Sequence, residues 1–200
     1  MKRGLVIGKF LPLHNGHISL INFAKERCDE LVVFAHKGAE DCIDVTVRLG
    51  WLYKVFGGDK SITIETNDTL LPESSVPSKD ISKVWADYLI KRFPDVNVLF
   101  SSEKYGEYVS GYMEIENVVY DIDRNIAPIS ATAIRKNPYD NWFFLPDVVN
   151  LIISKKFAST DRRAPAKLRL QRNSPIGIIR TLFRKWRSFI LERDMWFTRT

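Results

Sequence analysis

Residues 4–17 join an apolar run to a turn rich in glycine, proline and histidine, and this segment constrains the fold most strongly. Gly4 to Ile7 has the composition of a buried strand, and the sequence GKFLPLHNGH at residues 8–17 predicts a turn that leads into a helix. Gly8 has no Cβ, so backbone there can approach a ligand closely. Two histidines lie where the helix would begin, and free N–H groups at a helix start attract anions. The segment therefore predicts a strand–turn–helix unit that holds a nucleotide triphosphate.

Strand and helix patterns alternate through the first 150 residues. Strands are expected at residues 4–10, 30–35, 61–66, 96–100 and 117–120. Helices are expected at residues 17–27 and 45–56, from 78 through 89, in a short segment starting at 130, and at 151–157. Such alternation indicates an α/β fold, a Rossmann-like parallel sheet flanked by helices. Ligands bind such sheets beyond the carboxyl ends of the strands, where residues 8–17, 101–106 and 121–130 are expected.

Two motifs resemble those of a known enzyme family. Residues 8–17 resemble the Gly-x-Phe-x-Pro-x-His-x-Gly-His signature of the nucleotidyltransferase superfamily that shares an ancestral fold with class I aminoacyl-tRNA synthetases. Residues 129–135, ISATAIR, resemble an element of nicotinamide mononucleotide (NMN) adenylyltransferases. Residues 100–106 and 123–124 are similar to the adenylyltransferase half of the bacterial enzyme that also carries a ribosylnicotinamide kinase. The resemblance covers roughly residues 1–150.

A counterpart of that kinase half is not expected here. The segment GGDKS at residues 57–61 lacks the Gly-x-x-x-x-Gly-Lys spacing of a phosphate-binding P-loop. It also precedes a predicted strand, whereas a P-loop precedes a helix.

The resemblance implies transfer of an adenylyl group from ATP to NMN, which gives NAD and pyrophosphate. The second pKa of a phosphate monoester is about 6, so NMN is mostly dianionic at neutral pH and can attack the α-phosphate of ATP directly. Catalysis then requires in-line positioning and neutralisation of developing charge, with no general base. Mg²⁺ is the expected cofactor, held largely by ATP and water, and no protein metal site is expected.

The same resemblance assigns the site residues. The catalytic residues that it implies are His14, His17, Lys9 and Arg135. The ATP-binding residues that it implies are Gly8, Phe10, Gly16, Ser130, Thr132, Arg135, Arg48 and Arg124. The NMN-binding residues that it implies are Trp85 and Tyr105, with Trp85 stacking on the nicotinamide ring. A structural role is an open alternative for Arg48, Trp85, Tyr105 and Arg124, and His36 is expected to be structural.

Two other functions stay open. A sister nucleotidyltransferase would act on pantetheine phosphate or a phospho-alcohol, although the Arg-Thr-x-Gly-Ile-Ser-Thr-Thr motif of cytidylyltransferases is absent from the sequence. A catalytically idle nucleotide-binding scaffold would share the fold, although it would have no need for the two intact motifs.

Charge is distributed unevenly and suggests a separate C-terminal extension. Residues 1–154 contain 17 Lys and Arg against 21 Asp and Glu, a net charge of −4, whereas residues 155–200 contain 13 against 3, a net charge of +10. We therefore expect a nucleotidyltransferase domain at 1–157, a basic linker at 158–174 and an amphipathic basic helical tail at 175–200. The tail is expected to pack on its own domain or to join subunits of a homo-oligomer, and less strongly to bind a membrane or nucleic acid.

Composition predicts a globular, cytoplasmic protein. Hydrophobic residues make up 45% of the chain and aromatic residues 12%, enough for a sizeable core. Charged residues interrupt the first apolar run, and no stretch approaches the ~20 apolar residues of a membrane span. Cys28 and Cys42 lack metal-binding or CxxC spacing and are expected to be reduced packing residues.

Overall fold

The computed structural model describes residues 1–39, 41–73, 78–137 and 140–150. The chain divides into two units, residues 1–129 and 130–200. The expected closing helix, basic linker and amphipathic tail lie in residues 151–200, outside the described residues, and their proposed roles stay predictions.

The first unit contains one five-stranded sheet. Its strands are β1 (Arg3–Gly8), β2 (Glu30–Ala35), β3 (Ile62–Thr66), β4 (Val98–Ser101) and β5 (Glu116–Val119). They lie in the order β3-β2-β1-β4-β5, and every neighbouring pair is parallel. The expectation of a parallel α/β sheet is therefore confirmed. Strand order reverses between β1 and β4, so the carboxyl ends of these strands form the usual ligand position of such a sheet.

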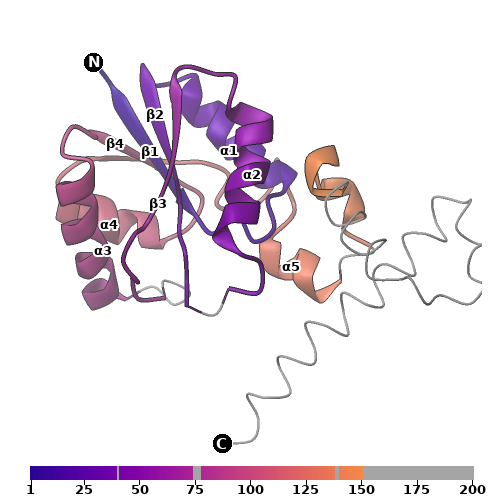
Figure 1. The fold of residues 1–200 in the computed structure, drawn as a ribbon. Coiled ribbons are helices and arrows are strands. Elements are labelled where there is room, and N and C mark those ends of the chain that lie inside the picture. Colours follow the sequence, from indigo (N-terminus) through magenta and orange to yellow (C-terminus); the bar gives the residue numbers. More distant parts are fainter. Residues whose placement is uncertain (40, 74–77, 138–139, 151–200) are drawn as a thin grey trace, which may run out of the picture. The chain divides into compact units, whose positions relative to one another are not determined.

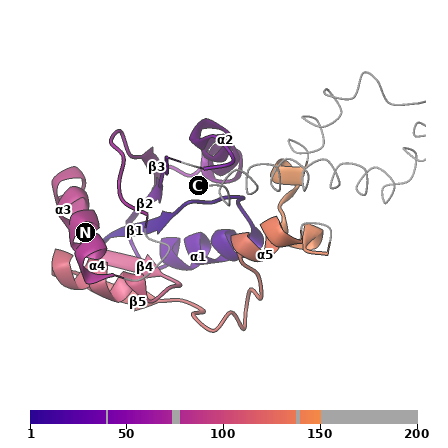
Figure 2. The same cartoon turned by 90° about the horizontal axis from the view of Figure 1, so that it is seen from below.

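Four helices flank the sheet. They are α1 (Asn15–Lys25), α2 (Val45–Phe56), α3 (Lys79–Arg92) and α4 (Tyr105–Met113). Helices α1 and α2 cover one face and α3 and α4 the other, as two views show (Figures 1 and 2). This arrangement follows from strands that are apolar on both sides: Leu5 of β1 packs in the α3–α4 cluster, while the adjacent Val6, also buried, points to the opposite face.

Helix α4 lies between β4 and β5, in a segment where the sequence analysis predicted no helix. Gly106 and Gly111 lower the intrinsic helix propensity of this segment. Val109 and Met113, four residues apart, nevertheless lie on the same helix face and are buried in the core cluster. Tertiary packing of this face outweighs the weak local propensity.

The second unit has less described structure. It contains helix α5 (Ala131–Lys136) and the 3₁₀ turn η1 (Trp142–Phe144). Helix α5 was expected from the sequence, because serine, here Ser130, is one of the residues favoured at a helix N-cap.

We predict opposite effects of alanine at the two glycines of α4. A Cβ at Gly106 would lie 2.2 Å from Ser101 Oγ, whereas a Cβ at Gly111 would have no atom within 4 Å. Gly106→Ala should lower the free energy of unfolding by about 1–3 kcal/mol through overpacking. Gly111→Ala should raise it by about 0.5–1 kcal/mol, because alanine favours the helix. Urea unfolding of both variants tests this, and equal effects would contradict the close packing of α4 on β4.

Candidate active site

The turn after β1 places the aromatic ring of Phe10 against the other residues of the first motif. Phe10 is buried and has φ 49°, a left-handed conformation that is unusual for a residue other than glycine. A Cβ at Gly8 would lie only 3.0 Å from the Phe10 ring, so glycine at this position leaves room for the ring. The Phe10 ring in turn meets the His17 ring edge-on, with centroids 5.0 Å apart.

His14 and His17 form a reciprocal cap at the start of α1. The His17 backbone N–H donates to His14 Nδ1 at 3.4 Å, and the His14 N–H donates to His17 Nδ1 at 3.4 Å. The two rings stack with centroids 3.6 Å apart. Because each Nδ1 accepts a hydrogen bond, the proton of each neutral ring belongs on Nε2. The cap therefore prepares both Nε2–H groups to donate to a ligand.

Both histidines are held in the neutral form. Burial, and secondarily the Arg124 charge, lower the pKa of His14 to about 3. Burial, His14 and Arg124 together lower the pKa of His17 well below its ordinary value. At neutral pH the pair therefore offers neutral hydrogen-bond donors, while cationic charge comes from side chains nearby.

The loop 121–129 supplies one of these cations and was only partly anticipated. The Asp121 carboxylate accepts hydrogen bonds from the N–H groups of Asn125, Ile126 and Ala127 at 2.6, 3.0 and 2.8 Å. This turn places Ala127 beside Gly16. A Cβ added to Gly16 would lie 3.4 Å from the Cβ of Ala127. An aspartate directly after a strand is the signal that could have identified this loop organiser.

Arg124 projects from the same loop. One guanidinium nitrogen donates to the Ile129 carbonyl and the other lies 3.7 Å from Glu103. Its charge lies close enough to lower the pKa of both histidines. The structure thus brings together six residues that the sequence analysis assigned to catalysis or ATP binding: Gly8, Phe10, His14, Gly16, His17 and Arg124.

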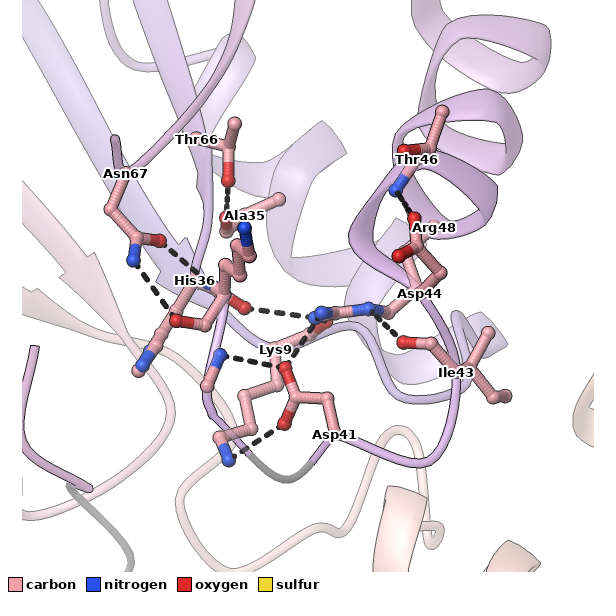
Figure 3. A network of polar contacts seen from close by, with 12 residues as sticks. Lys9, Ala35, His36, Asp41, Ile43, Asp44, Thr46, Arg48, Thr66 and Asn67 are labelled. Carbon is pink, nitrogen blue, oxygen red and sulfur yellow. Dashed lines mark hydrogen bonds and ion pairs between the residues drawn. The ribbon is translucent and has the colours of Figure 1, made fainter. Parts of the chain in front are cut away.

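Lys9 and Arg48 lie in a second polar network, after β1 and β2 (Figure 3). Lys9 Nζ contacts Asp41 at 3.0 Å and Glu73 at 2.6 Å. The Arg48 side chain is 0% exposed and donates to three backbone carbonyls and to Asp41. The proposed contact between Arg48 and ATP stays a prediction, because these protein partners engage the guanidinium. Asp41 was not anticipated from the sequence.

Trp85 lies in the core cluster between the sheet and α3. It is 2% exposed, and its Nε1–H donates to the Pro72 carbonyl at 3.0 Å. Its ring contacts the rings of Phe34 and His36, with centroids 6.5 and 4.6 Å away. Stacking on a nicotinamide ring would require an open face, so that role stays a prediction beside the structural one.

Tyr105 contacts the strand that precedes the first motif. Its hydroxyl donates to the Ile7 carbonyl of β1 at 3.1 Å, and burial raises the pKa of this phenol. The contact ties the start of α4 to the strand that precedes the histidines.

His36 follows β2 and is almost completely enclosed. It is 2% exposed, and neither ring nitrogen has a hydrogen-bond partner among the described residues. Burial, followed by the Lys9 charge, lowers the pKa of His36 to about 4. It is therefore a third neutral histidine.

The second motif belongs to the second unit, and its residues form hydrogen bonds with one another. Ser130 is the N-cap of α5, and its Oγ accepts the Ala133 N–H at 3.0 Å. Arg135 Nη2 donates to Thr132 Oγ1 at 3.0 Å. The three residues assigned to the triphosphate thus share the first turns of α5.

The described part of the chain lacks a metal-binding cluster and a membrane-spanning helix. It holds no group of three or more His, Cys, Asp or Glu residues placed to bind a metal ion. None of its helices has the length and apolar character needed to cross a membrane.

Comparison with known proteins agrees with these motifs. The profile of the cytidylyltransferase-like family matches residues 5–137. The chain is 32% identical over 167 residues to the trifunctional NAD biosynthesis/regulator protein NadR of Escherichia coli (strain K12), covering 73% of this chain and 39% of that protein. It is 26% identical over 141 residues to the nicotinamide-nucleotide adenylyltransferase of Thermococcus kodakarensis, covering 68% of this chain and 72% of that protein.

A solved structure shares the fold. The crystal structure of a NadR protein in complex with NAD and AMP-PNP superposes with a TM-score of 0.54 and 22% identity, over 74% of this chain and 45% of that chain. The chain thus spans about two fifths of the NadR sequence and under half of this NadR structure.

We predict that stability falls below neutral pH because neutral histidines are buried. For His36 the pKa is about 4 in the folded chain and about 6.5 when unfolded, so the unfolded state binds more protons between these values. Lowering the pH from 7 to 4.5 should therefore cost roughly 2–3 kcal/mol through His36. Urea unfolding of His36→Leu should show a weaker pH dependence than the parent protein, and an unchanged dependence would contradict the assignment.

We predict that Trp85 contributes mainly to packing. Trp85→Ala should lower the free energy of unfolding by about 3–5 kcal/mol, because it empties a buried site. The neighbouring Val84 is 49% exposed on α3, and Val84→Ala should change stability by no more than about 0.5 kcal/mol. A Trp85→Ala variant that keeps its stability and loses only NMN affinity would instead establish the stacking role.

Proposed function

The chain belongs to the cytidylyltransferase-like family, and on this premise we propose that it transfers the adenylyl group of ATP to NMN, giving NAD and pyrophosphate. The reciprocal cap of His14 and His17 is the observation that carries the proposal. It combines a helix start with two neutral Nε2–H donors at the carboxyl end of β1. The names of the E. coli and T. kodakarensis relatives support the NAD product.

The chemistry requires electrostatic complementarity. The NMN phosphate is already a nucleophile near pH 7, since its second pKa is about 6. As it attacks the α-phosphate, negative charge grows on the transferred group and on the departing pyrophosphate. Preorganised donors aimed at that charge lower the barrier. We assign this role to the Nε2–H groups of His14 and His17, with Arg124 as the adjacent cation.

Further contacts to ATP follow from the two motifs. Lys9 is proposed to reach a phosphate, and Gly8 and Gly16 to allow close backbone approach. Ser130, Thr132 and Arg135 are proposed to bind the triphosphate tail and to stabilise the leaving pyrophosphate. The guanidinium of Arg135 suits this task because it can donate two parallel hydrogen bonds to phosphate oxygens.

Mg²⁺ is proposed to accompany ATP. We propose that phosphate oxygens and water hold most of its coordination sites, as is usual for Mg²⁺ bound to a nucleotide. When bound, it supplies positive charge that offsets the charge of the triphosphate.

Trp85 and Tyr105 are the residues assigned to the NMN side of the site. The burial of Trp85 and the contact of Tyr105 with the Ile7 carbonyl support roles in shaping the site. Direct contact of either residue with NMN stays a prediction.

The full chain, incubated with ATP, Mg²⁺ and NMN, should form NAD and release pyrophosphate in equal amounts. Release of pyrophosphate with CTP and glycerol phosphate, or with ATP and pantetheine phosphate, but none with NMN would contradict the proposal. Failure with every acceptor would indicate a nucleotide-binding scaffold.

Two variants of His17 separate catalysis from helix capping. Both His17→Gln and His17→Ala should lower kcat by at least ~10², the cost of losing one preorganised donor. Gln at the third helical position still completes a capping box, so His17→Gln should keep its stability. His17→Ala should lose about 0.5–2 kcal/mol of stability as well. Wild-type kcat in His17→Gln would show that the imidazole takes no part in the reaction.

A further inference from the structure

A buried arginine joins the two loops that follow β1 and β2. The Arg48 guanidinium donates to the carbonyls of Lys9 and His36 at 2.6 and 2.8 Å, through the same nitrogen, Nη1. Nε donates to the Ile43 carbonyl at 3.0 Å, and Nη2 donates to Asp41 Oδ2 at 2.6 Å. Four hydrogen bonds thus connect Arg48 to both loops (Figure 3).

Asp41 provides the charge that balances Arg48. The Arg48 side chain is 0% exposed and that of Asp41 6%, so each would be an uncompensated buried charge without the other. Burial opposes ionisation of Asp41, but the Gly38 N–H, Arg48 and Lys9 outweigh it and lower the pKa of this carboxyl. The pair is therefore charged, and its orientation is set by directed hydrogen bonds.

Lys9 is held at both of its ends by this pair. Arg48 fixes its backbone carbonyl, and Asp41 Oδ1 lies 3.0 Å from its ammonium nitrogen. The next residue, Phe10, has the left-handed φ of 49° that starts the turn toward His14. Fixing the Lys9 carbonyl therefore also orients the peptide unit from which this turn begins.

Glu73 contacts the same ammonium in a different setting. Its Oε2 lies 2.6 Å from Lys9 Nζ, but the Glu73 side chain is 48% exposed. Because this ion pair is partly exposed to solvent, an incoming phosphate can displace Glu73 from Lys9 at little cost. The two carboxylates on Lys9 are thus one buried and one exposed.

We propose that Asp41 is a positioning residue for ATP binding. Asp41 acts through Arg48 and Lys9. The pair Asp41–Arg48 presets Lys9 and the turn that follows it, while Glu73 occupies the ammonium until phosphate replaces it. In this arrangement Arg48 supports the turn and does not itself contact ATP. The inference rests on the proposed function for the identity of the nucleotide.

Matched substitutions on the two carboxylates test the proposal. Asp41→Asn should raise the Kd for ATP with Mg²⁺, measured by calorimetry, by about tenfold, the scale of one lost charge-assisted hydrogen bond. Glu73→Gln removes the same charge from Lys9 and should leave the Kd unchanged or lower it. KM for NMN should change by less than about twofold in both variants. If both variants raise the Kd for ATP alike, the carboxylates act only as counter-charges and the proposal fails.

A cycle with Lys9→Met tests whether Asp41 acts through Lys9. If it does, adding Asp41→Asn to Lys9→Met should weaken ATP binding much less than Asp41→Asn weakens it in the parent protein. Fully additive losses would overturn the proposal, because a general loss of structure does not depend on the Lys9 side chain.

Asp41→Asn leaves the Arg48 charge buried and unpaired, so it could lower stability. The double variant Asp41→Asn/Arg48→Gln removes both charges and restores the balance. It should unfold no more readily than Asp41→Asn and should still bind ATP about tenfold more weakly than the parent protein. Parent-like affinity in the double variant would refute the positioning role.

Binding and turnover separate this inference from the proposed function. A parent protein that binds ATP but does not convert NMN would refute the proposed reaction, while the affinities of the variants would still decide the role of Asp41. A parent protein without ATP affinity would refute both.

Discussion

The hydrogen bonds between His14 and His17 join the start of a helix to the groups that are proposed to act on phosphate. A capping box normally satisfies free N–H groups at the start of a helix with Ser or Thr and Glu or Gln. Here imidazoles do so, because the Nδ1 of each ring accepts a hydrogen bond from the backbone N–H of the other histidine. One interaction thereby closes α1, orients both rings and fixes their tautomers. Gly16 and Phe10, which pack against the rings, are constrained by the same arrangement.

Electrostatics in the first unit follow a division between buried neutral groups and balanced charges. His14, His17 and His36 are all driven toward the neutral form by burial. Arg48 cannot lose its proton near neutral pH, so its burial requires Asp41 and three carbonyl oxygens. Arg124 and Lys9 keep partial exposure. In the proposed site a phosphate would meet fixed neutral donors and partly exposed cations, a combination suited to recognising a polyanion without a large desolvation cost.

Local patterns anticipated much of this arrangement. The strands were expected within a few residues of their observed bounds, because apolar runs ending in glycine or polar turns are a local property. The turn at residues 8–17 was equally accessible, since its glycines, proline and histidines act within one turn. Helix α4 was missed because its two glycines make the local propensity poor, and its stability comes from Val109 and Met113 against the sheet. Asp41 was missed because a single acidic residue in a loop has no periodic signal.

The sequence by itself determined the parallel α/β class, the helix start at residues 14–17 and the two motifs that resemble those of nucleotidyltransferases, because each depends on residues close together in the chain. Tertiary structure alone decided the surroundings of Arg48 and Trp85. Arg48 lies 39 positions after Lys9 and 12 after His36, and only the parallel pairing of β1 with β2 brings these carbonyls within reach of one guanidinium. Trp85 is enclosed because α3 packs on the sheet over Phe34. Whether a polar or aromatic side chain faces a ligand or the protein depends on long-range packing, which the local pattern does not encode.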